Sequence, residues 1–93
     1  MIVSLPRREA DLDIEHTDSR IIVHDRKRDY VHVMDQRALA VLQECDGTHS
    51  CNQIARELSY RRQEPYDNVA REVAHLVAAF ADLALVESAL LKN

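Results

Sequence analysis

The spacing of apolar residues changes once along this 93-residue chain, near residue 35. Before that point apolar and polar residues alternate, with the period of two that is typical of half-buried strands. After it, apolar residues recur at steps of three and four, as in amphipathic helices. Strands followed by helices predict an α+β fold in which the helices are segregated from the sheet.

A three-stranded antiparallel meander is predicted for residues 11 to 34. Polar and apolar residues alternate from 12 to 16, and a β-branched run follows from 21 to 24. The charged run from 25 to 29 is interpreted as a hairpin tip, because acids at both ends weaken the positive field that a phosphate site needs.

The third predicted strand, residues 30 to 34, contains no proline, lysine or acid. The backbone groups at the edge of a sheet pair with other extended chains unless charge or proline prevents it. This edge is therefore expected to accept an extended partner.

Two shorter helices are predicted next. Asp35 is expected to cap a helix of about residues 36 to 45, and Gly47 ends it by taking the left-handed conformation. Ser50 and Gln53 match a capping box, which predicts the start of a short second helix.

The third helix is predicted to be the longest. A polar loop from 59 to 64 precedes it, and Pro65 lies where the first turn of a helix tolerates proline. Its apolar stripe consists of Val69, Val73, Leu76, Val77, Phe80 and Leu83.

Charge and glycine content disfavour two classes of partner. Sixteen acidic residues against twelve basic ones give a formal net charge of −4, whereas a DNA-binding domain usually has a basic surplus. Gly47 is the only glycine, so a glycine-rich phosphate loop is excluded and no nucleotide cofactor is expected.

The chain is predicted to be a single cytoplasmic domain, residues 1 to 93. Its first residues are too short for the apolar part of a signal peptide, so Cys45 and Cys51 are expected to be free thiols. The most apolar stretch, 73 to 86, is interrupted by His75 and Asp82, and no membrane span is predicted.

No catalytic or metal site is predicted. Cys45, His49 and Cys51 are close in sequence, but Cys45 lies on an apolar stripe and the close cysteine pairs of zinc sites are missing. A cysteine–His75 nucleophile would lack an orienting group and an oxyanion hole. The histidines at 16, 24 and 32 are interpreted as polar tips on a half-exposed sheet.

Residues 34 to 47 resemble the PqqD-family pattern of a leucine–asparagine pair, a small-residue helix, an Ile-Leu pair and a terminal Cys-Asp-Gly. Residues 53 to 58 resemble the second helix of that family, and residues 67 to 86 its third helix with the closing Gly-Leu-Val. The resemblance covers about residues 11 to 87. Met34-Asp35 replaces Leu-Asn, and Ala84 stands where the family usually has glycine.

Within that family, Asp25-Arg26 and Tyr30 resemble the hairpin of the stand-alone proteins from lasso-peptide clusters, although the glycine of that hairpin is absent. Leu5-Pro6 resembles the amino terminus of those proteins.

The resemblance implies a winged-helix-like recognition element for ribosomally made peptides, which binds a precursor leader peptide and is not an enzyme. The leader would add as a strand in the groove between the third strand and the third helix, and no cofactor is implied. Its implied partners are a transglutaminase-like cysteine protease that removes the leader and a cyclase.

The resemblance and the free edge together predict the peptide-binding residues. Those on the third strand are Asp29, Tyr30, Val31, His32, Val33 and Met34. Those on the third helix are Val69, Glu72, Val73, Leu76 and Ala79, although the same spacing would also suit a core stripe. Glu72 is expected to be exposed, so that reversing its charge alters peptide affinity with little change in folding stability.

Two alternatives remain open. One is a PqqD-type chaperone of pyrroloquinoline quinone biosynthesis, with a radical enzyme as its partner. The other is a winged-helix DNA-binding module with a basic patch at Arg56, Arg61, Arg62 and Arg71. The eight residues from 59 to 66 between the second and third helical patterns argue against this module, since a helix-turn-helix has a turn of about three or four residues.

Overall fold

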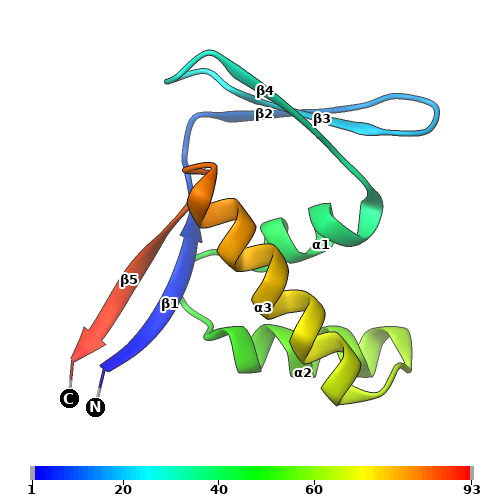
Figure 1. Ribbon diagram of the computed structural model, residues 1–93, viewed down its shortest axis with the longest axis vertical. Coiled ribbons are helices and arrows are strands. Elements are labelled where there is room, and N and C mark those ends of the chain that lie inside the picture. Colours follow the sequence, from blue (N-terminus) through cyan, green and yellow to red (C-terminus); the bar gives the residue numbers. More distant parts are fainter. Residues whose placement is uncertain (1, 93) are drawn as a thin grey trace.

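The computed structural model describes residues 2 to 92, with side chains described from 5 to 87. Its elements in chain order are β1 (Ile2–Arg8), β2 (Leu12–His16), β3 (Ile21–Asp25), β4 (Tyr30–Met34), α1 (Gln36–Glu44), α2 (Cys51–Arg62), α3 (Tyr66–Asp82) and β5 (Val86–Lys92). Strands β2, β3 and β4 form a three-stranded antiparallel sheet, which lies on one side of the helices in Figure 1. The predicted α+β class, with a meander followed by three helices, is confirmed.

A second sheet, in which β1 pairs antiparallel with β5, was not predicted from the sequence. Pro6 lies inside β1, and a proline usually argues against a strand. Here Gly47 N–H donates to Pro6 O at 2.9 Å and Arg8 N–H donates to Cys45 O at 2.8 Å, so the backbone groups of Pro6 and Arg8 face the turn after α1. Successive residues of a strand bond to opposite sides, so the backbone of Pro6 is directed away from β5. The missing N–H of Pro6 therefore removes no hydrogen bond between β1 and β5.

The predicted caps of the first two helices are confirmed. The Asp35 carboxylate accepts a hydrogen bond from Ala38 N–H at 2.9 Å, and Ser50 and Gln53 form a reciprocal capping box. Gly47 has a φ of 84°, the left-handed conformation expected of it.

The predicted loop from 59 to 64 is wrong, because α2 continues to Arg62 and only residues 63 to 65 connect it to α3. Polar side chains do not end a helix when they lie along its solvent-facing side. The helix ends at Gln63, which has a left-handed φ of 54°, and Ser59 Oγ donates to Glu64 O at 2.6 Å across the end. The eight-residue spacing that argued against a helix-turn-helix is therefore wrong as well.

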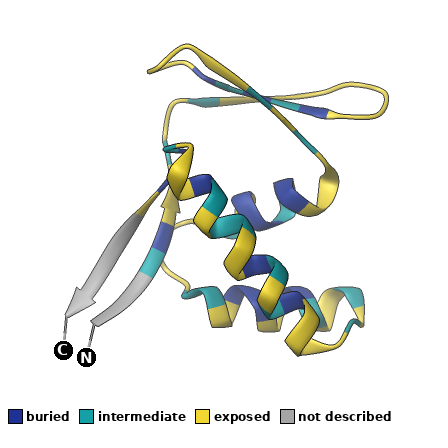
Figure 2. Cartoon of the chain, viewed as in Figure 1, coloured by how far each residue is buried: buried dark blue, intermediate teal, exposed yellow. Residues whose placement is uncertain are grey.

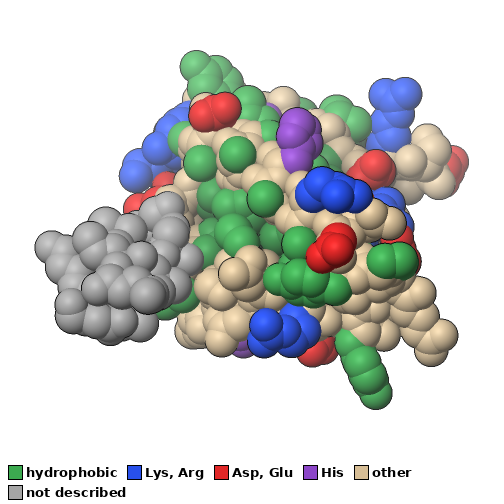
Figure 3. All heavy atoms as spheres, turned by 60° about the horizontal axis from the view of Figure 1, so that its bottom comes forward, with side chains coloured by type: hydrophobic (Ala, Val, Ile, Leu, Met, Phe, Trp, Pro, Cys, Tyr) green, Lys and Arg blue, Asp and Glu red, His purple; other side chains and the backbone are tan. Residues whose placement is uncertain are grey.

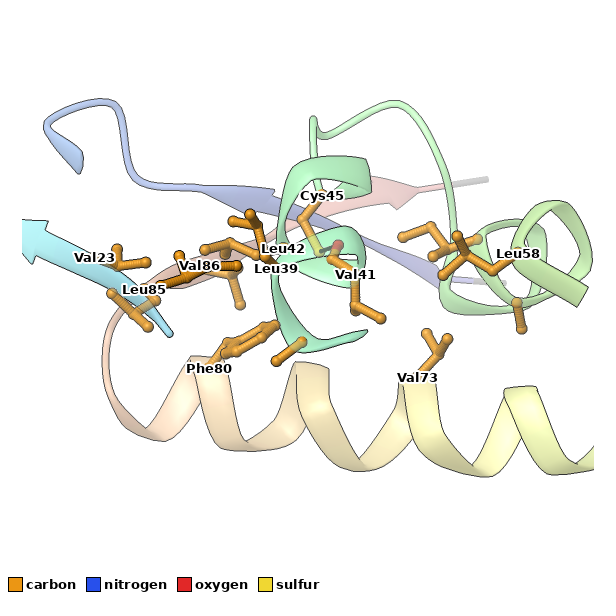
Figure 4. Packing of buried hydrophobic residues seen from close by; sticks show 14 of the residues in the cluster. Val23, Leu39, Val41, Leu42, Cys45, Leu58, Val73, Phe80, Leu85 and Val86 are labelled. Atoms are coloured by element: carbon orange, nitrogen blue, oxygen red, sulfur yellow. Dashed lines mark hydrogen bonds between the residues drawn. The ribbon is translucent and has the colours of Figure 1, made fainter. Parts of the chain in front are cut away.

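The hydrophobic core joins one face of β3 to all three helices and the start of β5, as the buried residues in Figure 2 show. In Figure 4, Phe80 extends from α3 toward α1, and Val23 of β3 lies beside Leu85. The face of the three-stranded sheet that carries buried Ile21 and Val23 is called the inner face, and the opposite face the outer face. None of the described helices is long and apolar enough to cross a membrane.

The charged run between β3 and β4 is a hairpin tip, as predicted, and Asp25 organises it. Its buried carboxylate accepts hydrogen bonds from the N–H groups of Lys27 and Arg28, at 3.1 and 3.2 Å, and pairs with the Arg28 guanidinium. Burial alone would raise the pKa of the Asp25 carboxyl, but these bonds and the Arg28 charge hold that pKa below its usual value. Asp29 has a φ of 57° and so supplies the left-handed turn without a glycine.

Ala84 also has a left-handed backbone, with a φ of 59°, just after α3 ends. For a residue with a Cβ, this conformation costs about 1–2 kcal/mol. Replacing Ala84 by glycine would remove that cost, but the greater freedom of glycine in the unfolded state would offset roughly 0.5–1 kcal/mol of the gain. We expect Ala84→Gly to raise the free energy of unfolding by about 0.5–1 kcal/mol in urea denaturation. Ala74→Gly, at an exposed site inside α3, should lower it by about 1 kcal/mol. Equal losses in the two variants would contradict strain at residue 84.

Candidate functional site

Strand β4 is one edge of the three-stranded sheet and pairs only with β3 among the described residues. The other edge strand, β2, carries Asp13 and Glu15, whose charges discourage pairing with a further strand. Between Tyr30 and Met34, β4 carries no acid, lysine or proline. The outward-facing backbone of this strand, called here the free edge of β4, is where the sequence predicted it.

The hydrogen bonds at the two ends of the β2–β3 pair fix which way the strands direct their backbone groups. Arg26 N–H donates to Asp11 O at 3.0 Å, and Thr17 N–H donates to Arg20 O at 2.9 Å. The even-numbered residues of β3 therefore bond to β2. Because successive residues of an antiparallel strand bond to opposite sides, the odd-numbered residues of β3 bond to β4.

The register of the next pair carries this alternation to β4. Val23 lies opposite His32, so His32 and the residues two positions away from it bond to β3. The N–H and C=O groups of Val31 and Val33 then point to the free edge. Two residues of β4 thus present both a donor and an acceptor to any extended chain that lies alongside.

The side chains of β4 alternate between the two faces of the sheet. Val31 and Val33 lie on the outer face, with 62% and 56% of their surface exposed. Tyr30, His32 and Met34 share the inner face with the buried residues of β3, and Met34 packs against the core. A chain added to the free edge would place every second side chain on this inner face.

His32 has a polar atom that the fold leaves without a partner. Its Nε2 is buried but accepts or donates no hydrogen bond among the described residues, although the residue as a whole is only half-buried. An unsatisfied buried polar group typically costs about 1–3 kcal/mol. By contrast, Nε2 of His24 on the outer face lies 3.0 Å from an Asp29 carboxylate oxygen.

The α3 residues predicted to bind peptide divide into two groups. Val69 and Val73 are only 1% and 0% exposed, so they belong to the core and present no surface to a peptide in this structure. Leu76 and Ala79 are half-buried, and Leu76 packs at the margin of the core, as Met34 does. Helical spacing could not separate these groups, because both lie on one face of α3.

Glu72 is not the freely exposed side chain that the helix pattern predicted. Its carboxylate accepts hydrogen bonds from Arg37 at 2.7 and 3.0 Å and from Arg62 at 2.9 Å, which ties α3 to α1 and α2. Arg37 also donates to Glu64 at 3.1 Å. The hydrogen bonds from Arg37 are the main cause that lowers the pKa of Glu72. Sequence reasoning missed Arg37, since no spacing rule links residues so far apart in the chain.

Two of the four arginines considered as a basic patch are paired with neighbouring acids. Arg61 pairs with Glu44 and with Glu57, at 3.0 and 3.1 Å, and Arg62 pairs with Glu72. In the view of Figure 3, acidic and basic side chains are interspersed around a central apolar area. The basic patch of the DNA-binding alternative is therefore weakened where Arg61 and Arg62 lie.

The cysteines lie in surroundings that disfavour thiolates. Cys45 is buried and its Sγ donates to Val41 O at 3.2 Å, while burial raises the pKa of this thiol to about 12. Burial also raises the pKa of Cys51. Within the described part of the chain, histidine, cysteine and acidic side chains form no group of three or more that could hold a metal ion.

Two solved structures share this fold. The first, described as lasso peptide synthetase B1 complexed with the leader peptide, matches 89% of this chain and 98% of its own length, with a TM-score of 0.71 and 17% identity. The second, TbiB1 in complex with the TbiA(beta) leader peptide, matches 87% of this chain and 94% of its own, with a TM-score of 0.70 and 12% identity. No family model matches the sequence, and no curated protein matches it. The resemblance noted in the sequence is thus confirmed at the level of the fold.

The paired state of Glu72 predicts a pH-dependent contribution to stability. Because its folded pKa is lowered, the contribution is present above the unfolded value near 4.5 and is lost as the pH falls through the folded pKa. We expect Glu72→Gln to lower the free energy of unfolding by about 1 kcal/mol at pH 7, and by less as the pH falls below about 4.

Glu57→Gln is the matched control, since the Glu57 side chain is 58% exposed and, among the described residues, pairs only with Arg61. Its effect should stay below about 0.5 kcal/mol. Urea denaturation at several pH values measures both variants. A loss at Glu72 no larger than at Glu57 would show that the Arg37–Glu72–Arg62 contacts do not stabilise the helices.

Proposed function

We propose that this protein binds the leader segment of a precursor peptide by strand addition to the free edge of β4. The observation that carries this proposal is the pair of outward-facing backbone groups at Val31 and Val33, on an edge without charge or proline. Strand addition derives affinity from such main-chain bonds and specificity from pockets for alternate side chains. The two proteins of the same fold were both solved with a leader peptide, which supports the same kind of ligand here.

In the proposed complex, the inner-face side chains of the leader lie between β4 and α3. Met34 and Leu76 each pack against the core, and Ala79 lies about one turn beyond Leu76 on α3. Small and apolar side chains at these positions would form the wall of the groove. Of the predicted contact residues, Val69 and Val73 would then act indirectly, by holding α3 in place.

The protein is further proposed to be an adaptor and not an enzyme. High thiol pKa values at both cysteines disfavour a thiolate nucleophile at neutral pH. An adaptor would deliver the precursor to a transglutaminase-like cysteine protease and then to a cyclase. Engaging the leader and the enzyme at once would make cleavage effectively intramolecular, with effective concentrations up to the millimolar range. The lasso-peptide pathway is favoured over a quinone-cofactor pathway because one of the two fold neighbours is described as a lasso peptide synthetase.

A DNA-binding module is the second candidate, because the connection of residues 63 to 65 between α2 and α3 has the length of a helix-turn-helix turn. The charge of α3 opposes it: Asp67, Glu72 and Asp82 outnumber Arg71, whereas a recognition helix that docks on DNA faces phosphates. Salt-sensitive binding to duplex DNA in a mobility-shift assay would favour this candidate.

Proline at Val31 or at Val33 tests strand addition, since each change removes one N–H from the free edge without removing a bond to β3. A lost hydrogen bond, with its acceptor left unpaired, is worth about 1–3 kcal/mol, so we expect leader affinity to fall roughly tenfold or more in each variant. Calorimetric titration with the leader encoded by a neighbouring precursor gene measures the change.

Ile14→Pro is the matched control, because the same alternation directs the Ile14 N–H to the free edge of β2. This variant should bind leader as the parent does. In a reconstituted cleavage assay, the β4 variants should raise the apparent KM for full precursor and leave cleavage of a leaderless core peptide unchanged. Parental affinity in both folded β4 variants would refute strand addition at this edge.

A further inference from the structure

His32 lies in the middle of the free edge of β4, and its side chain is directed to the inner face. This face is where the proposed leader strand would place alternate side chains. Nε2 of His32 has no partner among the described residues, whereas Nε2 of His24, on the outer face, lies 3.0 Å from Asp29. The free protein therefore holds an unused hydrogen-bonding group on the face along which the leader would be added.

The alternation along β4 determines which leader residue comes opposite His32. Val31 and Val33 would bond to the leader, so His32 between them occupies a non-hydrogen-bonded position. At such a position in an antiparallel pair, the Cβ atoms of opposite residues lie about 4.5–5.5 Å apart and their side chains share one face. The imidazole is thus within reach of one particular leader side chain.

The neighbours of His32 on the inner face specify the flanking leader residues. Tyr30 and Met34 lie two positions away on either side, and leader residues opposite them would share the inner face too. Met34 packs against the apolar core, and Tyr30 is 60% exposed. Both positions would bury apolar side chains of the leader.

We propose that His32 is a specificity-determining residue that selects a leader side chain bearing a hydrogen-bonding oxygen, flanked by apolar side chains two residues before and after it. The inference rests on the proposed strand addition. Nε2 is buried in the free protein, and a rotation about the Cβ–Cγ bond, a broad torsion for histidine, would turn it toward the added leader strand. A site that holds a buried polar group rejects an apolar side chain more strongly than an apolar site rejects a polar one, because the polar group is left unpaired.

A displayed library of random seven-residue segments, selected on the parent and on His32→Val, tests the inference. The parent should enrich Ser, Thr, Asn, Gln, Asp or Glu between two apolar residues spaced four apart, and His32→Val should enrich apolar residues at the central position. For one peptide selected on the parent, His32→Val should weaken binding about tenfold. Replacing the central residue of that peptide by alanine should then change its affinity for the His32→Val variant little.

Two further variants keep the outcomes distinct. His24→Val, on the outer face, should leave the enriched pattern unchanged, and His32→Gln keeps a hydrogen-bonding group if His32→Val fails to fold. Loss of binding of the enriched peptides in the Val31→Pro, Val33→Pro double variant would support strand addition. If the parent and both His32 variants nevertheless enrich the same central residues, the role of His32 is refuted while strand addition stands. If the double variant still binds them, strand addition itself fails.

Discussion

Each residue of a β-strand can offer its backbone hydrogen bonds to only one side, and this constraint decides what β4 can do. The alternation that bonds His32 to β3 leaves the groups of Val31 and Val33 without a neighbouring strand in the part of the chain that the structure describes. The register of the β3–β4 pair is fixed by β3, because a shift by one residue would move buried Ile21 and Val23 to the outer face. The direction of the free amides is thus set by the core.

The remaining elements hold this edge in place without covering it. Phe80 and Leu85 join the far end of α3 to the inner face of the sheet, and the Arg37–Glu72 contact fixes α1 against α3. The backbone at the end of β1 bonds to the turn after α1, and Glu9 N–H donates to Leu85 O at 2.9 Å. The β1–β5 sheet therefore connects the turn after α1 to the end of α3, and leaves the free edge of β4 unobstructed among the described residues.

Local patterns in the sequence were sufficient for the meander, the three helices and their first caps. They also identified β4 as an edge, because the absence of charge and proline is a property of five consecutive residues. The β1–β5 sheet was missed because it pairs the two ends of the chain, and a proline within β1 is tolerated only in this particular register. The extent of α2 was missed because Gln63 takes a backbone conformation that its identity does not reveal.

The candidate site was predicted less completely than the fold. The sequence could not show that Val69 and Val73 are buried while Leu76 is only half-buried, nor that distant Arg37 pairs with Glu72. Residue-resolved amide hydrogen exchange, with and without a saturating leader peptide, tests the account most directly. The Val31 and Val33 amides should exchange fast in the free protein and become strongly protected in the complex, while the Ile14 amide on the opposite edge should not change. Unchanged exchange at Val31 and Val33 in the saturated complex would contradict it.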